Sequence, residues 1–473
     1  MLFNSLTFIV FFIIVMGLYR APISWRMKKQ MLLVASYIFY AAWNPPFILL
    51  LWFSTMVDWE VARRLDRTDA PGMRRVLLGI SLAANLGLLG FFKYATFALE
   101  NFTALTDLLG IPFHPAAPGI LLPVGISFYT FQTLSYTLDV YRRTMKPIGS
   151  FLDYALFVTY FPQLVAGPIV RPSELVPQFQ QPPRVTLQDY CWGLFLITLG
   201  LFQKVVLADG PFAFTADMVF RAQDPLNMLD AWAGALAFAG QIFCDFAGYS
   251  TCAIGISRCM GFHLCPNFNA PYAAVGFSDF WRRWHISLST WLRDYLYITL
   301  GGNRISATRT QVNLMITMML GGLWHGASWN FVIWGTLHGA YLIVERLLRA
   351  GFANQAWTGH RIVRIALGAL TLALVTIAWV FFRAQDLPTA MRLVTSMLGM
   401  QPGGVKLLAT IDIQNVFMPL AVLVALQCWL RNKDFRSVVS GWPWWLTGSL
   451  WALMAIVLIL MQGVSGAFIY FQF

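Results

Sequence analysis

The sequence predicts an all-α protein that crosses a membrane many times. Of its 473 residues, 58% are hydrophobic and 11% are charged, whereas about a quarter of the residues in an ordinary soluble domain are charged. A helix needs about 20 apolar residues to span a bilayer, so we expect roughly ten to thirteen membrane helices, about eleven as a central value, together with re-entrant or interfacial helices. The uncharged runs are 1–19, 30–57, 108–138, 154–170, 310–344, 365–382, 413–430 and 437–473.

The net charge indicates topology more than it indicates a nucleic-acid partner. The formal net charge is +12, but the basic residues lie between the hydrophobic runs and form no single patch. This pattern is typical of cytoplasmic loops that face anionic lipid. Basic residues follow the first run and none precedes it, so we expect a retained helix with its N-terminus outside, and not a signal peptide. The loops expected in the cytoplasm are 20–29, 63–75 and 142–146.

Proline and charge predict the next breaks. The sequence Asn-Pro-Pro at 44–46 divides the run 30–57, because a proline pair interrupts a helix. It predicts a helical hairpin or a helix with a re-entrant piece. Residues 98–120 contain no lysine or arginine, which is typical of an outside loop. Residues 171–186 hold four prolines among polar residues and predict a surface connector.

Residues 279–344 are expected to form the catalytic core of a single integral-membrane domain that covers residues 1–473. The first part, 279–309, mixes tryptophan with arginine, which is typical of a segment at the membrane interface. The uncharged run 310–344 is long for one span, and basic residues flank it on both sides. A hairpin that breaks at the glycine pair 321–322 places both flanks in the cytoplasm.

Two histidines stand beside tryptophan in this core. His285 lies in F-W-R-R-W-H-I-S-L-S, and His325 lies in L-W-H-G-A-S-W-N directly after Trp324. Acyl transfer to an alcohol needs a base, which imidazole supplies near neutral pH, and donors for the oxyanion that forms. We interpret His325 as the base and His285, in a wetter interfacial position, as a positioning or donor-side residue. A structural hydrogen-bonding role stays open for each.

Other polar residues near His325 are candidates for support. Asn330, Ser328 and the backbone N–H of Gly326 are candidate donors to the oxyanion. His338 follows His325 by thirteen residues and is a candidate helper behind it.

Asp245 lies in the middle of an apolar run. A carboxylate in a membrane needs partners, and Gln241, Tyr249 and Ser250 are at helical reach. A proton relay and a structural hydrogen-bond hub are both open for it.

Signatures of several other enzyme classes are missing from the sequence. No two histidines are spaced as i and i+4, and none of the six cysteines forms a C-x-x-C pair, so we expect no metal site. There is no G-x-S-x-G nucleophile turn and no Walker-type glycine loop, which argues against a serine hydrolase and against a nucleotide-binding site of that kind. We expect no bound cofactor.

Motifs over most of the chain make it similar to a known family. On these motifs the sequence resembles the membrane-bound O-acyltransferase (MBOAT) family, and within it the bacterial alginate O-acetylation branch. The motifs are F-F-K-Y at 91–94, P-V-G-I-S-F-Y-T-F-Q at 123–132, F-P-Q-L-V-A-G-P-I-V-R at 161–171, C-D-F-A-G-Y-S at 244–250, N-F-N-A-P-Y at 267–272, F-W-R-R-W-H-I-S-L-S-T-W-L-R-D-Y-L-Y at 280–297, G-G-N-R at 301–304, L-W-H-G-A-S-W-N at 323–330, V-F-F-R-A at 380–384 and F-I-Y-F-Q-F at 468–473.

The resemblance implies a helical core in which an outer and an inner cavity join near His325. The family's invariant histidine, regarded as catalytic, falls on His325, and its second hallmark histidine falls on His285. The implied donor is a cytoplasmic acyl thioester, acetyl-CoA, which supplies acetyl for O-acetylation of an extracytoplasmic polysaccharide such as alginate. A bacterial inner-membrane location and a periplasmic SGNH-type acetyltransferase as the next carrier are also implied. The alternatives are D-alanyl transfer from a carrier protein and a lipid or polymer transporter without covalent chemistry.

A basic, tryptophan-rich stretch is the candidate donor site. It contains Arg282, Arg283, Arg293 and Arg304, which we place at the cytoplasmic face. We hypothesise that some of these guanidinium groups bind the phosphates of coenzyme A or of a phosphopantetheine arm. The alternative is an ordinary positive-inside anchor.

Overall fold

The computed structural model describes residues 1–116, 118–165, 167–352, 355, 360–461, 466 and 469. Every regular element in these ranges is a helix, which confirms the predicted all-α class. The motif at 468–473 lies outside the described residues except for Ile469. Five helical stretches in the described ranges are long and apolar enough to cross a membrane, and the number of about eleven stays a prediction. They are Pro71–Leu108, Leu187–Arg221, Trp329–Phe352, Arg361–Arg383 and Thr410–Leu430.

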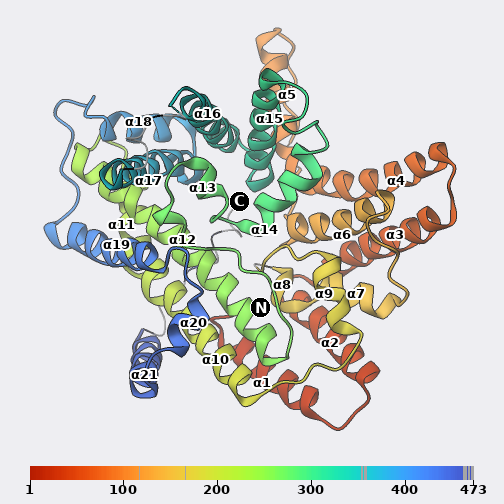
Figure 1. The fold of residues 1–473 in the computed structure, drawn as a ribbon. Coiled ribbons are helices and arrows are strands. Elements are labelled where there is room, and N and C mark those ends of the chain that lie inside the picture. The colour runs from red at the N-terminus through yellow and green to blue at the C-terminus, as the bar shows by residue number, and fades with distance from the viewer. Residues whose placement is uncertain are drawn as a thin grey trace. The chain divides into compact units, whose positions relative to one another are not determined.

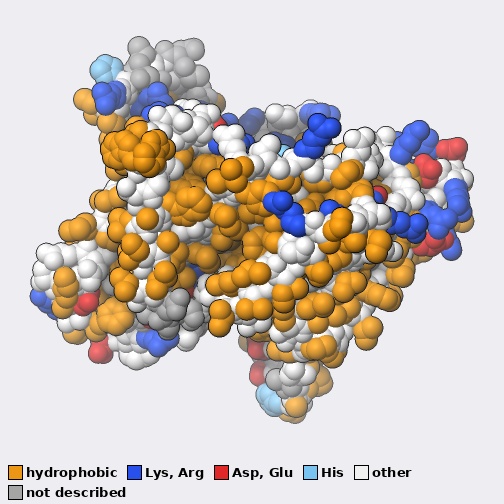
Figure 2. Space-filling view, turned by 90° about the horizontal axis from the view of Figure 1, so that it is seen from below, with side chains coloured by type: hydrophobic (Ala, Val, Ile, Leu, Met, Phe, Trp, Pro, Cys, Tyr) orange, Lys and Arg blue, Asp and Glu red, His pale blue; other side chains and the backbone are white. Residues whose placement is uncertain are grey.

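The surface is strongly apolar. Large hydrophobic side chains are exposed along many of the helices, and Figure 2 shows hydrophobic side chains over most of the face in view. Soluble monomers rarely expose apolar patches of this extent. The surface therefore suits contact with lipid.

The chain divides into two compact units, each made of two stretches of sequence. The N-terminal unit comprises Met1–Gly193 and Ala253–Cys265, and the C-terminal unit comprises Leu194–Cys252 and Pro266–Phe473. The single functional domain expected from the sequence stays a prediction.

The N-terminal unit packs around α6 (Ile126–Tyr141), which is buried along almost its whole length. The buried carboxylate of Asp58 accepts hydrogen bonds from the Ser81 hydroxyl, from Asn85 Nδ2 at 2.7 Å and from the Thr137 hydroxyl at 3.0 Å. These hydrogen bonds join the three helices that carry these residues through one carboxylate. The other helices of this unit are α1 (Leu6–Arg20), α2 (Trp25–Ala41), η1 (Pro45–Phe47), α3 (Ile48–Arg67), α4 (Pro71–Leu89), η2 (Gly90–Tyr94), α5 (Ala95–Leu108), α7 (Phe151–Thr159), α8 (Phe161–Leu164) and α9 (Pro172–Phe179).

The predicted break at 44–46 is confirmed, since α2 ends before it and α3 begins after a short 3₁₀ turn. Two expectations for loops are wrong in part. The outside loop 98–120 is helical as far as the end of α5. The connector 171–186 begins with α9, in which Leu175 and Phe179 are fully buried. Pro172 is the first residue of that helix, a position where its missing N–H costs nothing.

The C-terminal unit holds the segments with the candidate histidines. Figure 1 shows α13 to α17 grouped together, with α13 against α16 and α16 against α17. Its helices are α10 (Leu187–Leu201, which begins in the N-terminal unit), η3 (Phe202–Phe212), α11 (Ala213–Arg221), α12 (Met228–Cys259, which ends in the N-terminal unit), η4 (Pro271–Ala273), α13 (Phe277–Trp281), α14 (Ile286–Trp291), η5 (Leu292–Tyr297), α15 (Ala307–His325), α16 (Trp329–Phe352), α17 (Arg361–Arg383), α18 (Leu387–Met397), α19 (Thr410–Leu430), α20 (Phe435–Ser440) and α21 (Trp444–Leu460).

The uncharged run 310–344 forms two helices, as predicted, but the predicted break at 321–322 is wrong. Helix α15 continues through both glycines, and the break lies at 326–328. Gly322 serves close packing between α15 and α16. A Cβ on Gly322 would lie 2.2 Å from the backbone oxygen of Phe331 and 3.2 Å from the Cα of Gly335, both in α16, so the backbones of the two helices approach each other closely here.

The true break also depends on a glycine. Gly326 caps α15 in an extended conformation, and a Cβ at this position would collide with the ring of Phe331. The chain therefore turns from α15 into α16 at a residue without a side chain, which leaves His325 as the last residue of its helix.

Candidate active site

His325 lies in a nearly closed aromatic cluster. Its ring centroid is 5.1 Å from that of Trp324, 5.1 Å from that of Trp334 and 5.2 Å from that of Phe382. The residue is 4% exposed. These neighbours exclude most water from the ring, and we expect a neutral imidazole here, which is the form that a general base needs.

His285 is also buried, so the prediction that it is the wetter of the two histidines is wrong, and its place at the membrane interface stays a prediction. The residue is 0% exposed and packs edge-on against Phe246, with 4.6 Å between ring centroids. It lies between α13 and α14 in the left-handed region, at φ 42°, a conformation that costs a residue with a Cβ about 1 kcal/mol or more. Its position lies outside the five helical stretches that are long and apolar enough to cross a membrane, and burial lowers its pKa to about 3.

Asn267 fixes which nitrogen of His285 carries the proton. Oδ1 of Asn267 accepts hydrogen bonds from the backbone N–H of Ser287 at 3.3 Å and from its hydroxyl at 2.7 Å. The same oxygen lies 3.2 Å from Nδ1 of His285. Because an oxygen only accepts, Nδ1 must donate, and Nε2 keeps its lone pair. The imidazole of His285 is thereby held in one tautomer.

The structure brings together the two histidines that the sequence singled out. They come from α15 and from the turn before α14, and their ring centroids are 6.4 Å apart. Trp324 adjoins both rings, at 6.1 Å from His285 and 5.1 Å from His325. The roles assigned to the two histidines stay predictions.

His338 lies behind His325 within the same aromatic cluster. Its ring centroid is 4.8 Å from that of Trp334 and 5.1 Å from that of Trp281. The residue is fully buried, and within the described part of the chain neither ring nitrogen has a hydrogen-bond partner. Trp334 touches both histidines, so the position fits the predicted helper.

One of the predicted oxyanion donors, Asn330, already uses its amide group in a structural hydrogen bond. Nδ2 of Asn330 donates to the carbonyl of Ala384 at 2.9 Å, so one amide hydrogen already holds the start of α16 beside the end of α17. Ser328 and Gly326 lie in the turn that follows His325. The backbone N–H groups of this turn are therefore the simpler candidates for the oxyanion.

Asp245 belongs to a buried ionic cluster and not to the helical neighbours expected for it. Its carboxylate pairs with Lys204, which also pairs with Asp209 at 2.6 Å. Asp245 and Asp209 further accept the backbone N–H groups of Ile469 at 2.9 Å and Gly466 at 3.0 Å. Sequence reasoning missed Lys204, although a lone lysine inside an apolar stretch is a signal in itself. The cluster favours the structural hub over the proton relay.

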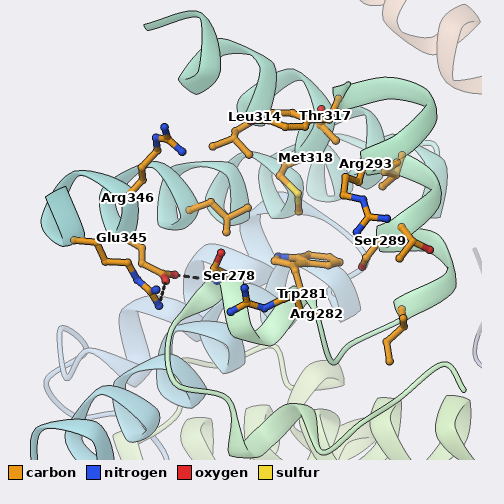
Figure 3. Close-up of a pocket in the computed structure, with 16 residues that line it drawn as sticks. Ser278, Trp281, Arg282, Ser289, Arg293, Leu314, Thr317, Met318, Glu345 and Arg346 are labelled. Carbon is orange, nitrogen blue, oxygen red and sulfur yellow. Dashed lines mark hydrogen bonds and ion pairs between the residues drawn. The ribbon is translucent and has the colours of Figure 1, made fainter. Parts of the chain in front are cut away.

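A cavity of about 640 Å³ lies next to the histidine segment. Figure 3 shows Trp281 and Met318 in the middle of it, with Arg346 and Arg293 on opposite sides. Its described lining residues are Ser278, Trp281, Arg282, Ile286, Ser289, Thr290, Leu292, Arg293, Tyr297, Leu314, Thr317, Met318, Leu342, Glu345, Arg346 and Arg349.

Glu345 holds the wall of this cavity in place. Its carboxylate accepts the backbone N–H of Ser278 at 2.9 Å and pairs with Arg349 at 2.6 Å, as the dashed lines in Figure 3 mark. Ser278 lies in the first turn of α13, where a negative charge is favourable. Helix α13 is thus fastened to α16, and the turn that carries His285 follows it.

Two of the four predicted donor-binding arginines line the cavity, and two do not. Arg282 and Arg293 line it. Arg283 instead donates to Asp279 at 2.9 Å and to Asn432 at 2.9 Å, so a structural role accounts for it. The other, Arg304, is exposed.

Sequence reasoning missed Arg346 and Arg349 at the far end of α16, because they looked like the positive flank of an apolar run. Three of the four lining arginines have a carboxylate nearby. Arg349 pairs with Glu345 at 2.6 Å, Arg293 with Asp294 at 2.6 Å, and Arg282 lies 4.0 Å from Asp279. Arg346 has no ion pair with a carboxylate of the described residues. It is therefore the guanidinium best placed to receive an anion.

A second cavity of about 300 Å³ has a polar lining that includes Asp217 and Arg383, which pair at 2.6 Å. Arg383 ends α17, and the contact between Asn330 and Ala384 sets that end beside the start of α16. The first cavity lies by Arg346 at the other end of α16. The two cavities therefore open near opposite ends of this helix pair.

Comparison with known proteins agrees with a membrane-embedded acyltransferase. The family model of the MBOAT, membrane-bound O-acyltransferase family, matches residues 7–384. The chain therefore belongs to the membrane-bound O-acyltransferase family, is a multi-pass membrane protein and is an O-acyltransferase. The family match sets the transporter alternative aside.

Three relatives show the range of acceptors within this similarity. The chain is 42% identical over 402 residues to the probable alginate O-acetylase AlgI of Pseudomonas putida, covering 84% of this chain and 80% of the relative. It is 35% identical over 492 residues to the peptidoglycan O-acetyltransferase of Helicobacter pylori, covering 94% and 91%. It is 29% identical over 282 residues to the teichoic acid D-alanyltransferase of Streptococcus thermophilus, covering 55% and 64%.

Proposed function

We propose that this protein transfers an acetyl group from a cytoplasmic thioester, acetyl-CoA, for O-acetylation of an extracytoplasmic polysaccharide such as alginate. The observation that carries the proposal is the buried pair His285 and His325, 6.4 Å apart, beside a cavity lined by four arginines. The similarity to alginate and peptidoglycan O-acetylating relatives supports acetyl as the group that is moved.

The chemistry needs one base and a closed site. Nε2 or Nδ1 of neutral His325 takes the proton of the attacking hydroxyl, whose oxygen forms a C–O bond with the thioester carbonyl carbon. The C–S bond breaks, and the proton passes from the imidazolium to the leaving thiolate. An ester and a free thiol result, so atoms and charge balance. Backbone N–H groups after His325 stabilise the oxyanion.

The two cavities give the reaction a direction. The arginine-lined cavity suits the phosphates of the donor, and the positive-inside rule assigns such a surface to the cytoplasm. The polar cavity at the other end of α16 and α17 suits a hydroxyl-bearing acceptor. In this proposal the protein lies in the bacterial inner membrane with its N-terminus in the periplasm, and a periplasmic SGNH-type protein carries the acetyl group onward. Strong labelling of a cysteine at position 67 from the periplasmic side would contradict this topology.

The test is acetyl transfer by purified protein in lipid nanodiscs, with acetyl-CoA as donor and an alginate oligomer together with the periplasmic partner as acceptor system. Removing a general base typically costs about 10² to 10⁴ in rate, so His325→Ala is expected to fall at least that far while it still binds donor. The matched control is His360→Ala, because His360 is exposed. Near-normal turnover by His325→Ala would overturn the assignment of the base.

D-alanyl transfer is the second candidate, because a D-alanyltransferase is among the relatives. The same assay with a D-alanyl carrier protein as donor separates the two. We expect turnover with acetyl-CoA and none with the carrier. The reverse result would replace the proposed donor while leaving the acyltransferase chemistry intact.

A further inference from the structure

The arginine-lined cavity stops short of the two histidines. Neither His285 nor His325 is among its described lining residues, although Ile286 and Met318 are. Met318 precedes His325 by seven residues, which is about 10 Å along a helix axis. A thioester carbonyl has to approach the attacking oxygen to about 3.5 Å before it reacts. The acyl end of a donor in this cavity must therefore move beyond it.

One face of α15 leads from the cavity to His325. Leu314, Met318, Gly321 and His325 are spaced i, i+4, i+7 and i+11, which places them on the same side of a helix. The first two line the cavity, and Gly321 is buried between them and the histidine. An acyl group that follows this face has to pass Gly321.

Leu292 limits the space on one side of Gly321. A Cβ built there would lie 3.1 Å from Cδ1 of Leu292, and apart from the adjoining backbone of α15 and the two neighbouring residues no other described heavy atom comes within 4 Å of it. Carbon atoms in favourable contact lie about 3.5 to 4.0 Å apart, so a methyl group at Gly321 fits only if Leu292 gives way. We call Gly321, Leu292 and Met318 the constriction.

The wall on the other side of the cavity offers no comparable route. Trp281 lies 5.8 Å from Trp334 and 5.1 Å from His338, centroid to centroid, and Trp334 and His338 are almost fully buried. Opening this wall would separate several packed rings. The constriction instead has two rotatable aliphatic side chains, and Leu292 begins the π-helix η5, an irregularity that is frequent at functional sites.

The presence of glycine at position 321, inside helix α15, needs an explanation. Alanine ordinarily stabilises the interior of a helix relative to glycine. Close packing against Gly335 accounts for Gly322, and the ring of Phe331 accounts for Gly326. For Gly321, the only neighbour that a side chain would meet in the described structure is Leu292.

We propose that the constriction selects the acyl group by size: it admits an acetyl group to His325 and excludes longer chains. The inference rests on the proposed donor function and adds no chemical step to it. Gly321 supplies the gap, and Leu292 and Met318 set its width.

The test measures release of CoA thiol and acyl transfer with acetyl-CoA, propionyl-CoA and butyryl-CoA, using the full chain in nanodiscs. One methylene in an apolar pocket is worth about 10- to 200-fold in discrimination. Leu292→Ala is expected to raise the use of butyryl-CoA relative to acetyl-CoA by about tenfold or more. Gly321→Ala is expected to lower acetyl transfer at unchanged donor binding, and Leu292→Ala in the same chain is expected to restore it.

The matched control is Gly79→Ala, because Gly79 lies inside helix α4 and a Cβ there meets nothing within 4 Å. Thermal unfolding separates misfolding from a blocked passage, and Leu292→Ala alone remains a test if Gly321→Ala does not fold. An unchanged donor preference in Leu292→Ala would overturn the constriction while the proposed function stands. If the unmodified protein used no acyl-CoA, the proposed function would fall, and the constriction with it.

Discussion

The rings of His285 and His325 lie beside each other, with 6.4 Å between their centroids and 57° between their planes. We expect one polar atom of a substrate to bind within hydrogen-bond reach of a nitrogen on each ring. His285 is held in one tautomer by Asn267, so its part in this arrangement is prepared before a substrate arrives.

If both rings act on one substrate atom, their contributions are not additive. We expect His285→Ala to lower single-turnover acetyl transfer less than His325→Ala does. The double variant is expected to transfer acetyl at a rate within a few fold of that of His325→Ala, because the rate losses from residues that act as a unit are strongly non-additive. The measurement is single-turnover transfer by the four proteins of the cycle. Independent, multiplicative losses would show that the two rings act separately.

Acid is expected to destabilise the protein through His285. Burial lowers the pKa of His285 from 6.5 to about 3, so between these pH values the unfolded chain binds a proton that the folded chain excludes. The free energy of unfolding therefore has its full value, as far as His285 is concerned, above about pH 6.5. It falls as the pH drops towards 3, by at most about 1.4 kcal/mol per pH unit. Thermal unfolding in detergent, measured across this range, checks the slope. His285→Asn has no ring to titrate and should unfold with a shallower pH dependence.

Arg346 is expected to bind the donor. Arg346→Gln removes the one lining guanidinium that has no carboxylate partner in the described structure, and a hydrogen bond to a charged group contributes about 1.5 to 3 kcal/mol. The KM for acetyl-CoA should rise about tenfold or more, with kcat little changed, since the contact is made equally before and during reaction. Arg304→Gln is the control, because Arg304 is exposed and does not line the cavity. Equal effects from both variants would point to a general loss of positive charge.

Lys204 is expected to be important for stability. Lys204→Met leaves Asp209 and Asp245 buried without their cation, and breaking a buried pair from one side typically costs about 3 to 5 kcal/mol. Lys204→Met combined with Asp245→Asn should lose less stability than Lys204→Met alone, because one uncompensated charge is removed. Thermal and denaturant unfolding in detergent compare the three proteins. A double variant less stable than Lys204→Met would show that the pair is not coupled in this way.

Local signals in the sequence predicted the apolar runs, the proline break at 44–46 and the two histidines. The features that the sequence did not predict depend on contacts between distant segments. Glycines 321 and 322 looked like a helix break, but close approach to α16 and to Leu292 explains them inside a helix. Arg346 looked like a topological anchor until the fold placed it in the cavity wall. The partner of Asp245, Lys204, is 41 positions away in the chain, beyond the reach of helical spacing.

The carboxylates of Asp209 and Asp245 hold residues 466 and 469 through main-chain N–H groups. Every amino acid except proline offers the same N–H. These hydrogen bonds therefore depend on the register of the chain and not on which side chain stands at either position. Substitutions at these two positions should act through packing, because Ile469 is buried and a Cβ on Gly466 would lie 3.1 Å from Oδ1 of Asp209. Inserting or deleting a single residue between them would instead leave one carboxylate facing the wrong peptide unit.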